Sequence, residues 1–150
     1  GIGIYGVDSN GKIIETKRKK LKFPGCLKIP ILQIRKVKKG QKISYGGITK
    51  LKRDSTLATL GIGYADGILK LFRKNLSLEI KGKHCKIVGS ITMDSIIIDV
   101  TDVDTKYLKV GHYLEIINED FISNVNLKNF KISIYELFTL LSDRIKRIYV

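Results

Sequence analysis

Short stretches of alternating or β-branched apolar residues recur along the chain and predict a series of strands. A repeat of two places successive side chains on opposite faces of a strand, and residues 76–80 show it clearly, with Ser77 and Glu79 between apolar neighbours. The turn Lys81-Gly82-Lys83 and a second apolar stretch, 85–88, follow, which predicts a β-hairpin. Further strands are predicted at 12–15, 31–37, 56–62, 95–100 and 113–117.

The spacing changes from two to that of a helix near the end of the chain. Ser133 stands three residues before Glu136, the arrangement of a capping box. Apolar residues then recur on one helical face, namely Ile134, Leu137, Phe138, Leu140 and Leu141. Six or more short strands favour a closed or nearly closed barrel, because closure removes exposed sheet edges. The predicted fold is therefore mostly β, a compact β-barrel-like domain with one amphipathic helix near the C-terminus.

Composition agrees with one globular unit over residues 1–150. The chain has 43% hydrophobic and 28% charged residues, which is typical of a folded domain, and no repeat or low-complexity tract divides it. No apolar run approaches the roughly 20 residues that span a bilayer, and no signal peptide is apparent, so a cytoplasmic location is expected. The opening, Gly1 to Gly6, lacks an initiator methionine and resembles the end of a strand, so we expect a fragment.

A net charge of +14 raises the question of nucleic acid. Basic residues are dense at Lys17, Arg18, Lys19, Lys20 and Lys22, and again at Lys36, Lys38 and Lys39. Such charge can bind phosphates through counterion release. Proteins that bind RNA or single strands usually also have exposed aromatic residues, and no aromatic residues are interleaved with the basic ones here. A solvated basic surface is favoured; a basic nucleic-acid-binding β-barrel stays open as the alternative, and a purely structural interaction domain is a third.

The cysteines and histidines give no metal-binding pattern. Cys26 and Cys85 are far apart and form no CxxC pair, and His84 and His112 are the only histidines. Neither a zinc site nor a disulfide is expected. For Cys85 a small apolar side chain at a strand end is favoured over a reactive thiol.

Four tyrosine- or methionine-containing motifs carry the strongest signal. In chain order they are Ser44-Tyr45-Gly46, Gly63-Tyr64-Ala65-Asp66-Gly67, Met93-Asp94 and Tyr135-Glu136. The ordered set resembles the C-terminal β-domain of alanine racemases, the fold-type III enzymes that depend on pyridoxal phosphate. Ile4-Tyr5-Gly6 and the ending with Arg144, Arg147 and Tyr149 also match, so the resemblance covers essentially the whole chain. Each motif alone is weak, whereas their order is specific.

The resemblance implies a role for Tyr45. Interconversion of L- and D-alanine, which supplies precursors of cell-wall peptidoglycan, removes the α-proton from one face of the substrate and returns it to the other. In the family one acid-base group is a lysine of an N-terminal barrel, which also binds pyridoxal phosphate, and the other corresponds to Tyr45. A phenol titrates near ~10, so it needs a partner that favours the phenolate. The resemblance implies that the barrel supplies that partner and that Tyr45 acts across a homodimer interface.

The resemblance implies binding roles for the other motifs. Tyr64, Met93 and Asp94 would line the entrance and hold the substrate carboxylate, with the Met93 backbone donating a hydrogen bond. Tyr135 would reach the cofactor phosphate in its own subunit. For Asp66 and Gly67 a tight turn is the favoured interpretation.

The chain also departs from the family pattern. Ser90 stands where many members carry arginine, and Thr49 where a further tyrosine is frequent. No segment resembles the cofactor-binding Val-Lys-Ala-Asn motif, so residues 1–8 are interpreted as the tail of a connection from a separate N-terminal barrel. Without that barrel the chain is expected to bind no cofactor and to be inactive. The sequence leaves open whether alanine or serine is preferred.

Overall fold

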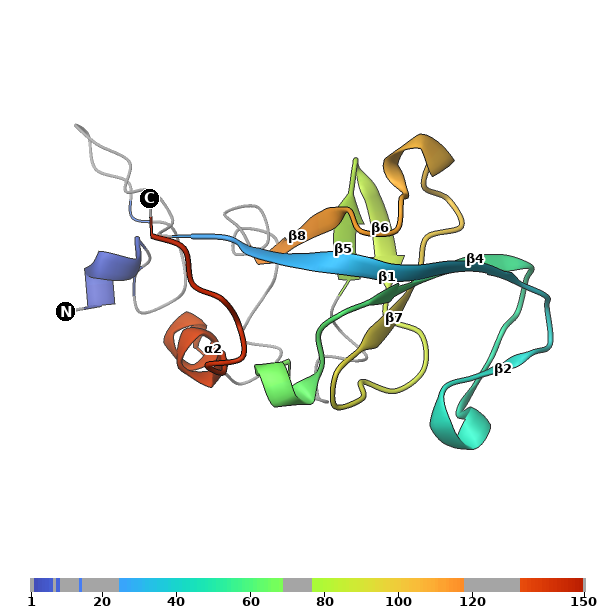
Figure 1. The fold of residues 1–150 in the computed structure, drawn as a ribbon, viewed down its shortest axis with the longest axis horizontal. Helices are drawn as coiled ribbons and strands as arrows, with labels where there is room; N and C mark the ends of the chain where they lie inside the picture. Colours follow the sequence, from blue (N-terminus) through green and yellow to red (C-terminus); the bar gives the residue numbers. More distant parts are fainter. Residues whose placement is uncertain are drawn as a thin grey trace.

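A curled sheet with a short helix beside it forms the body of the protein (Figure 1). The computed structural model describes residues 2–6, 8, 14, 25–68, 77–117 and 133–149. The strands are β1 (Leu27–Val37), β2 (Lys42–Ile43), β3 (Thr49–Lys50), β4 (Ser55–Leu60), β5 (Ser77–Ile80), β6 (Lys83–Lys86), β7 (Ile96–Asp99) and β8 (Tyr113–Ile117). The helices are α2 (Ile134–Leu140) and the 3-10 helices η1 (Ile2–Tyr5), η2 (Tyr45–Gly47), η3 (Tyr64–Asp66) and η5 (Thr105–Tyr107).

The long strand β1 organises the main sheet, whose order is β7-β4-β1-β8 with antiparallel pairing throughout. One half of β1 pairs with β8 and the other half with β4. The register with β4 shifts between Ile31 and Gln33. Up to this point the alternation is regular, with Ile29 and Ile31 buried and Leu32 52% exposed. After the shift the phase changes, so Gln33 is exposed and Ile34 is half-buried.

The hairpin of β5 and β6 occupies the open side of this sheet. Lys81 and Gly82 connect the strands with φ angles of 49° and 74°, as expected for a two-residue turn that matches the strand twist. β5 lies against β8 and β6 against β7, and Ile87 forms a bridge to Ile98. The predicted barrel-like fold is thus confirmed as a curled half-barrel with the hairpin across its opening. Lys83, predicted in the turn, already belongs to β6.

The core lies inside this curl and is almost entirely aliphatic. Its most deeply buried side chains are Ile31, Leu57, Leu60, Ile62, Ile68, Ile96, Ile98, Val100, Cys85 and Leu137. Full burial of one such aliphatic side chain contributes about 1.5–3 kcal/mol. The core therefore joins all four strands of the main sheet to the hairpin and to α2.

The predicted helix is present, and it is short. Ser133 accepts a hydrogen bond from the Glu136 N–H, and the Glu136 carboxylate accepts one from the Ser133 N–H, which confirms the capping box. Leu137 fills the core, but Leu140 is 37% exposed and Leu141 already lies at the C-cap. The buried face is therefore narrower than the apolar spacing predicts.

One expectation at the N-terminal end is wrong, and two others stay predictions. The opening residues form the 3-10 helix η1 and not the end of a strand, because the Gly6 N–H bonds back to the Gly3 carbonyl at 3.0 Å with Gly6 at φ 71°. The strand predicted at 12–15 and the basic run from Lys17 to Lys22 lie outside the described residues, apart from position 14.

Cys85 has the predicted structural role. Its side chain is 1% exposed within the core, and burial, with a smaller contribution from the carboxylates of Asp99 and Asp102, raises the pKa of its thiol to about 11. A thiol with so high a pKa is a poor nucleophile at neutral pH. Cys26, by contrast, is exposed.

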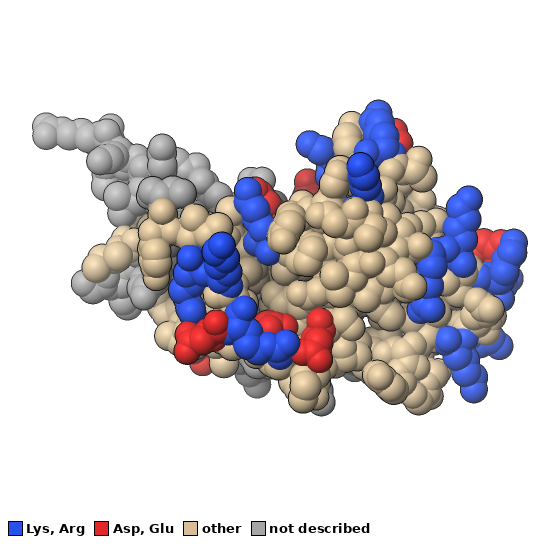
Figure 2. Space-filling view, viewed as in Figure 1, with Lys and Arg blue, Asp and Glu red and all other residues tan. Residues whose placement is uncertain are grey.

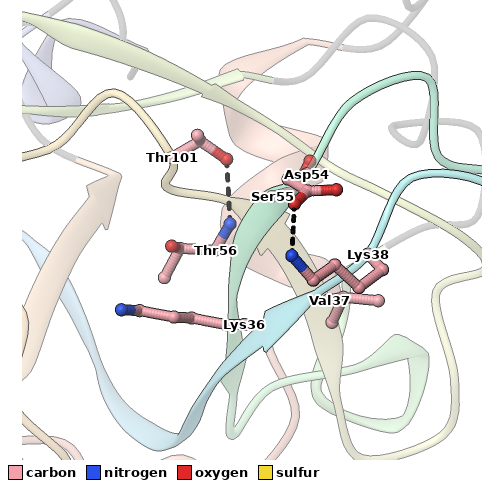
Figure 3. Close-up of a pocket in the computed structure, with 7 residues that line it drawn as sticks. All are labelled: Lys36, Val37, Lys38, Asp54, Ser55, Thr56 and Thr101. Atoms are coloured by element: carbon pink, nitrogen blue, oxygen red, sulfur yellow. Dashed lines mark hydrogen bonds and ion pairs between the residues drawn. The ribbon is translucent and has the colours of Figure 1, made fainter.

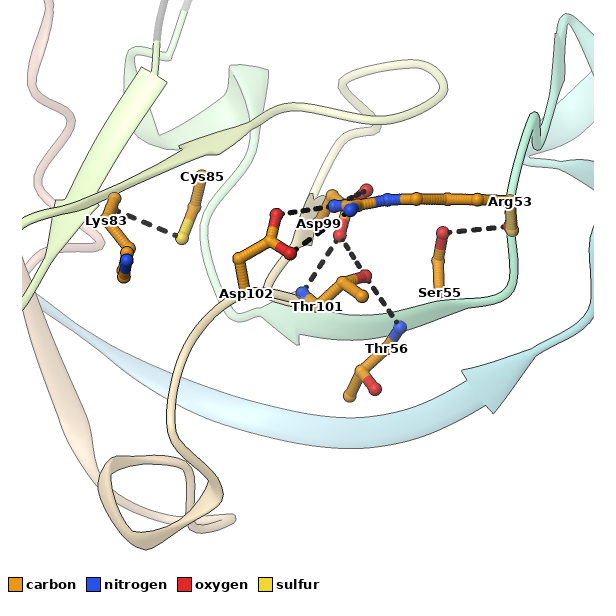
Figure 4. Close-up of polar contacts among 8 residues, drawn as sticks. All are labelled: Arg53, Ser55, Thr56, Lys83, Cys85, Asp99, Thr101 and Asp102. Atoms are coloured by element: carbon orange, nitrogen blue, oxygen red, sulfur yellow. Dashed lines mark hydrogen bonds and ion pairs between the residues drawn. The ribbon is translucent and has the colours of Figure 1, made fainter.

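A polar network ties the end of β7 to β4 (Figure 4). Arg53 donates two hydrogen bonds to Asp102, at 3.1 and 2.6 Å, and its guanidinium lies 3.8 Å from Asp99. Thr101 donates to Asp99 through its N–H and its hydroxyl and accepts from the Thr56 N–H. The hydrogen bond to Arg53 lowers the pKa of Asp102. These contacts fix the turn after β7, and the charged groups of Arg53, Asp99 and Asp102 are paired with one another.

Charged side chains gather at several places on the face shown in Figure 2, including the top of the view. Lysines cluster around the end of the sheet where β1 meets β2, with Lys38 paired to Asp54 at 2.8 Å. Acidic and basic groups alternate near α2 and η3, where Arg144 and Arg147 form ion pairs. Within the described part of the chain, no helix has the length and apolar character needed to cross a membrane, and no cluster of potential metal ligands occurs.

Candidate functional site

Tyr45 stands on a tight turn at the far end of the sheet. It begins η2, between β2 and β3, and its side chain is 83% exposed. Gly46 and Gly47 both have positive φ, 70° and 57°, a conformation that glycine adopts without steric cost. The Tyr45 side chain on this turn therefore projects from the surface.

The loop between β6 and β7 contacts this turn through Gly89 and Ser90. The Ser90 N–H donates a hydrogen bond of 2.9 Å to the Ser44 hydroxyl. Gly89 lies directly against Ser44. The departure at Ser90 thus falls next to the Tyr45 motif, but it is the backbone of Ser90 that makes the contact.

The same loop also binds the Tyr64 motif. The N–H groups of Tyr64 and Ala65 donate to the carbonyls of Thr92 and Met93, at 2.9 and 3.0 Å. A Cβ at Gly63 would overlap these two carbonyls, so glycine allows the backbones to come this close. The side chains of Tyr64 and Met93 stay 40% and 52% exposed.

Asp66 and Gly67 form the tight turn that was predicted. The buried Asp66 carboxylate accepts a 2.8 Å hydrogen bond from the Gly63 N–H, and Gly67 has a φ of 103°. Gly67 packs against the carbonyl of Leu140 at the end of α2, and the Ser142 N–H donates to the Asp66 carbonyl at 3.3 Å. The turn is thereby joined to the C-terminal segment.

Arg144 links two of the motifs. Its guanidinium donates to Asp94 at 2.6 Å and lies 3.5 Å from the buried carboxylate of Asp66. These two carboxylates, Asp94 first, raise the pKa of Arg144. The Asp94 carboxylate is therefore engaged by a cation of its own chain. Sequence analysis named Arg144 only as part of a terminal pattern, since a contact across 50 positions leaves no local signal.

These contacts join the predicted motifs into one continuous surface, which we call the motif band: η2, the loop 89–95, η3 and the end of α2. In Figure 1 the band runs along the lower side of the molecule, from η2 in cyan to α2 in red. Tyr45, Tyr64, Met93 and Asp94 all lie on it. The structure thus brings the predicted substrate residues Tyr64, Met93 and Asp94 together, and places Tyr45 at the opposite end of the band from α2.

Tyr135 lies in the first turn of α2 and is half-buried. Its hydroxyl donates a long hydrogen bond of 3.3 Å to the carbonyl of Asp8. Partial burial, followed by the Asp8 carboxylate, raises the pKa of Tyr135. The hydroxyl is therefore protonated at neutral pH and acts as a hydrogen-bond donor.

A surface pocket between β1 and β4 contains none of the predicted residues (Figure 3). It is lined by Lys36, Val37, Lys38, Asp54, Ser55, Thr56 and Thr101. Its charged groups Lys38 and Asp54 pair with each other, and the Thr101 hydroxyl accepts from the Thr56 N–H. The pocket is thus a shallow depression over the hydrogen-bonded strands β1 and β4, and none of its lining residues belongs to the motif band.

The half-barrel, the helix beside it and the motif band define a small β-domain that presents tyrosine-bearing turns along one side. Residues 26–149 match the family model described as alanine racemase, C-terminal domain. The chain belongs to this family, which confirms the resemblance inferred from the ordered motifs.

Full-length relatives extend well beyond this chain. Alanine racemase of Fusobacterium nucleatum is 37% identical over 150 residues, which cover 100% of this chain and 40% of that protein. Alanine racemase of Rickettsia bellii is 34% identical over 149 residues, which cover 99% of this chain and 36% of that protein. The chain therefore spans less than half the length of these curated relatives.

Solved structures show the same fold. Alanine racemase from Bartonella henselae with covalently bound pyridoxal phosphate has a TM-score of 0.84 and 34% identity, covering 100% of this chain and 40% of that one. Alanine racemase of Clostridium difficile 630 in complex with cycloserine has a TM-score of 0.82 and 32% identity, covering 97% and 38%. The prediction of a mostly β domain with a late helix is confirmed.

Proposed function

We propose that this chain is the C-terminal domain of a cytoplasmic, homodimeric alanine racemase and that it works only with an N-terminal barrel domain of the same protein. The observation that carries the proposal is the motif band, which joins turns from four parts of the sequence into one surface around exposed tyrosines. The lengths and names of the relatives support a further domain and a racemase activity.

Tyr45 is proposed as the acid-base group on one face of the substrate. Its hydroxyl would take or return the α-proton there, while a group from the barrel serves the other face. Its 83% exposure supports the proposal, since a side chain that reaches into another domain or subunit must project from its own. A buried Tyr45 would have argued for a packing role.

Tyr64, Met93 and Asp94 are proposed to receive the substrate carboxylate. Among the described residues the Met93 N–H has no protein acceptor, and that amide is the group proposed to donate to the carboxylate. Asp94 contributes through its ion pair with Arg144, which holds the loop in place and neutralises a negative charge that would repel the substrate. A small amino acid such as alanine, or serine, suits a site with these groups.

The residues present fit one end of pyridoxal phosphate. The protonated hydroxyl of Tyr135 is a hydrogen-bond donor suited to a phosphate oxygen. The covalent anchor for the cofactor is proposed to come from the N-terminal barrel. When bound, the cofactor would supply the electron-withdrawing ring that acidifies the α-proton.

Tyr135→Phe is expected to weaken binding of pyridoxal phosphate by the two-domain enzyme about 10- to 100-fold, the loss of one hydrogen bond to a charged group. Cofactor titration followed by absorbance measures the effect. Tyr113→Phe is the matched control, because Tyr113 is 66% exposed and lies on β8, outside the motif band. Equal affinities in the wild type and the Tyr135→Phe variant would refute the phosphate contact.

The test of the proposed function compares this chain alone with the two-domain enzyme in an alanine racemisation assay. We expect no racemisation by the chain alone, with or without added pyridoxal phosphate, and racemisation once the barrel is present. Activity of the chain alone would show that it carries a complete site. No activity in either case, together with salt-dependent binding of RNA or DNA, would favour the basic nucleic-acid-binding alternative.

A further inference from the structure

We propose that Ser44 is a positioning residue that holds Tyr45 in place, locked by the backbone of Gly89 and Ser90. This role rests on the proposed function of Tyr45 and adds the means by which the turn is held. The Ser44 hydroxyl contacts the loop 89–95.

The backbone of Ser44 is the first observation. Ser44 has a φ of 71° and a ψ of 172°, a region that residues with a Cβ rarely occupy and that is essentially reserved for glycine. Lys81, in the hairpin turn, is the other described residue besides glycine with positive φ. Such a conformation persists when surrounding contacts determine it, and it occurs immediately before Tyr45.

The contacts that hold Ser44 come from a distant part of the chain. The Ser44 hydroxyl accepts the 2.9 Å hydrogen bond from the Ser90 N–H, a residue 46 positions away. The Gly47 N–H donates to the Ser44 carbonyl at 3.0 Å and closes the turn that carries Tyr45. Both groups of Ser44, side chain and carbonyl, are thus used to fix the turn.

Gly89 supplies the space for this arrangement. A Cβ at Gly89 would lie 2.5 Å from the Ser44 Cβ and 3.1 Å from its hydroxyl, and Gly89 itself has a φ of 81°. Any larger residue would push Ser44 away. Because the donor is the backbone N–H of residue 90, either serine or the arginine frequent in the family can provide it.

The test uses Ser44→Ala and Gly89→Ala in the two-domain enzyme. Racemisation is measured together with exchange of the α-proton for solvent deuterium, separately from L- and D-alanine. The two enantiomers present their α-protons to opposite groups, so a displaced Tyr45 affects one of them first. We expect racemisation to fall about 100-fold, as for a misplacement of roughly 1 Å, with little change in KM.

The exchange pattern separates positioning from folding. Exchange should fall with racemisation for the enantiomer whose α-proton faces Tyr45 and persist for the other. Ser55→Ala is the matched control, because it removes a hydrogen bond of 3.1 Å from the Ser55 hydroxyl to the Arg53 carbonyl just before β4, outside the motif band. We expect the rates of that variant to stay near wild type.

Two results would overturn the role of Ser44: equal loss of exchange from both enantiomers in both variants, or rates that match those of Ser55→Ala. A wild-type two-domain enzyme that racemises alanine no faster than the background rate would overturn the proposed function itself. Loss of folded protein in one variant lowers both exchange rates together, and the second variant then decides.

Discussion

Replacing Tyr45 by phenylalanine is expected to lower racemisation by the two-domain enzyme about 10²- to 10⁴-fold, the usual contribution of one acid-base group. Phenylalanine keeps the ring and loses the hydroxyl that would carry the proton. Because the side chain is 83% exposed on its own domain, the change should leave the stability of the domain nearly untouched. The rate is measured with each enantiomer as substrate, and stability by thermal unfolding.

Tyr113→Phe provides the matched control for this experiment. Tyr113 is also exposed, at 66%, but lies on β8 outside the motif band. Its variant should racemise alanine at the wild-type rate. If Tyr45→Phe were as active as Tyr113→Phe, the assignment of Tyr45 as an acid-base group would be wrong, whereas membership of the family would stand.

The Gly67→Ala substitution is expected to destabilise the domain by at least about 3 kcal/mol, through overpacking and an unfavourable left-handed backbone. Gly67 has a φ of 103°, and a Cβ there would overlap the backbone of Leu140 at the end of α2. Either α2 or the turn from Gly63 to Gly67 must move. Chemical denaturation of this chain measures the loss.

Gly82→Ala separates the two causes. Gly82 also has a positive φ, of 74°, but nothing lies within 4 Å of the Cβ that alanine would add. Its variant should lose about 1–2 kcal/mol from backbone strain alone. If both variants lost the same stability, close packing of α2 on the turn would contribute nothing, and the description of the motif band would need revision.

Local sequence determined most of the secondary structure. The alternation at 76–80 and the turn at Lys81-Gly82 place the hairpin, because strand period and turn conformation depend on neighbouring residues. The pair Ser133 and Glu136 fixes the start of α2 for the same reason. The order of the tyrosine and methionine motifs was likewise sufficient to identify the family.

Other features became visible only with the tertiary structure. The loss of alternation after Leu32, where Gln33 is exposed and Ile34 half-buried, follows from a register shift against β4. The short η1 replaces the strand end suggested by the opening residues. Alternation describes one strand and not its partner, so it misses such irregularities. The half-barrel with a hairpin across its opening is likewise a matter of strand pairing between distant segments.

The candidate site shows the same division. The motifs name Tyr45, Tyr64, Met93, Asp94 and Tyr135 as predictions, but not what holds them. The bonds from Ser90 to Ser44 and from Arg144 to Asp94 cross 46 and 50 positions. A sequence specifies such contacts only through the whole fold, since the partners are brought together by packing of the core and leave no periodic or local pattern of their own.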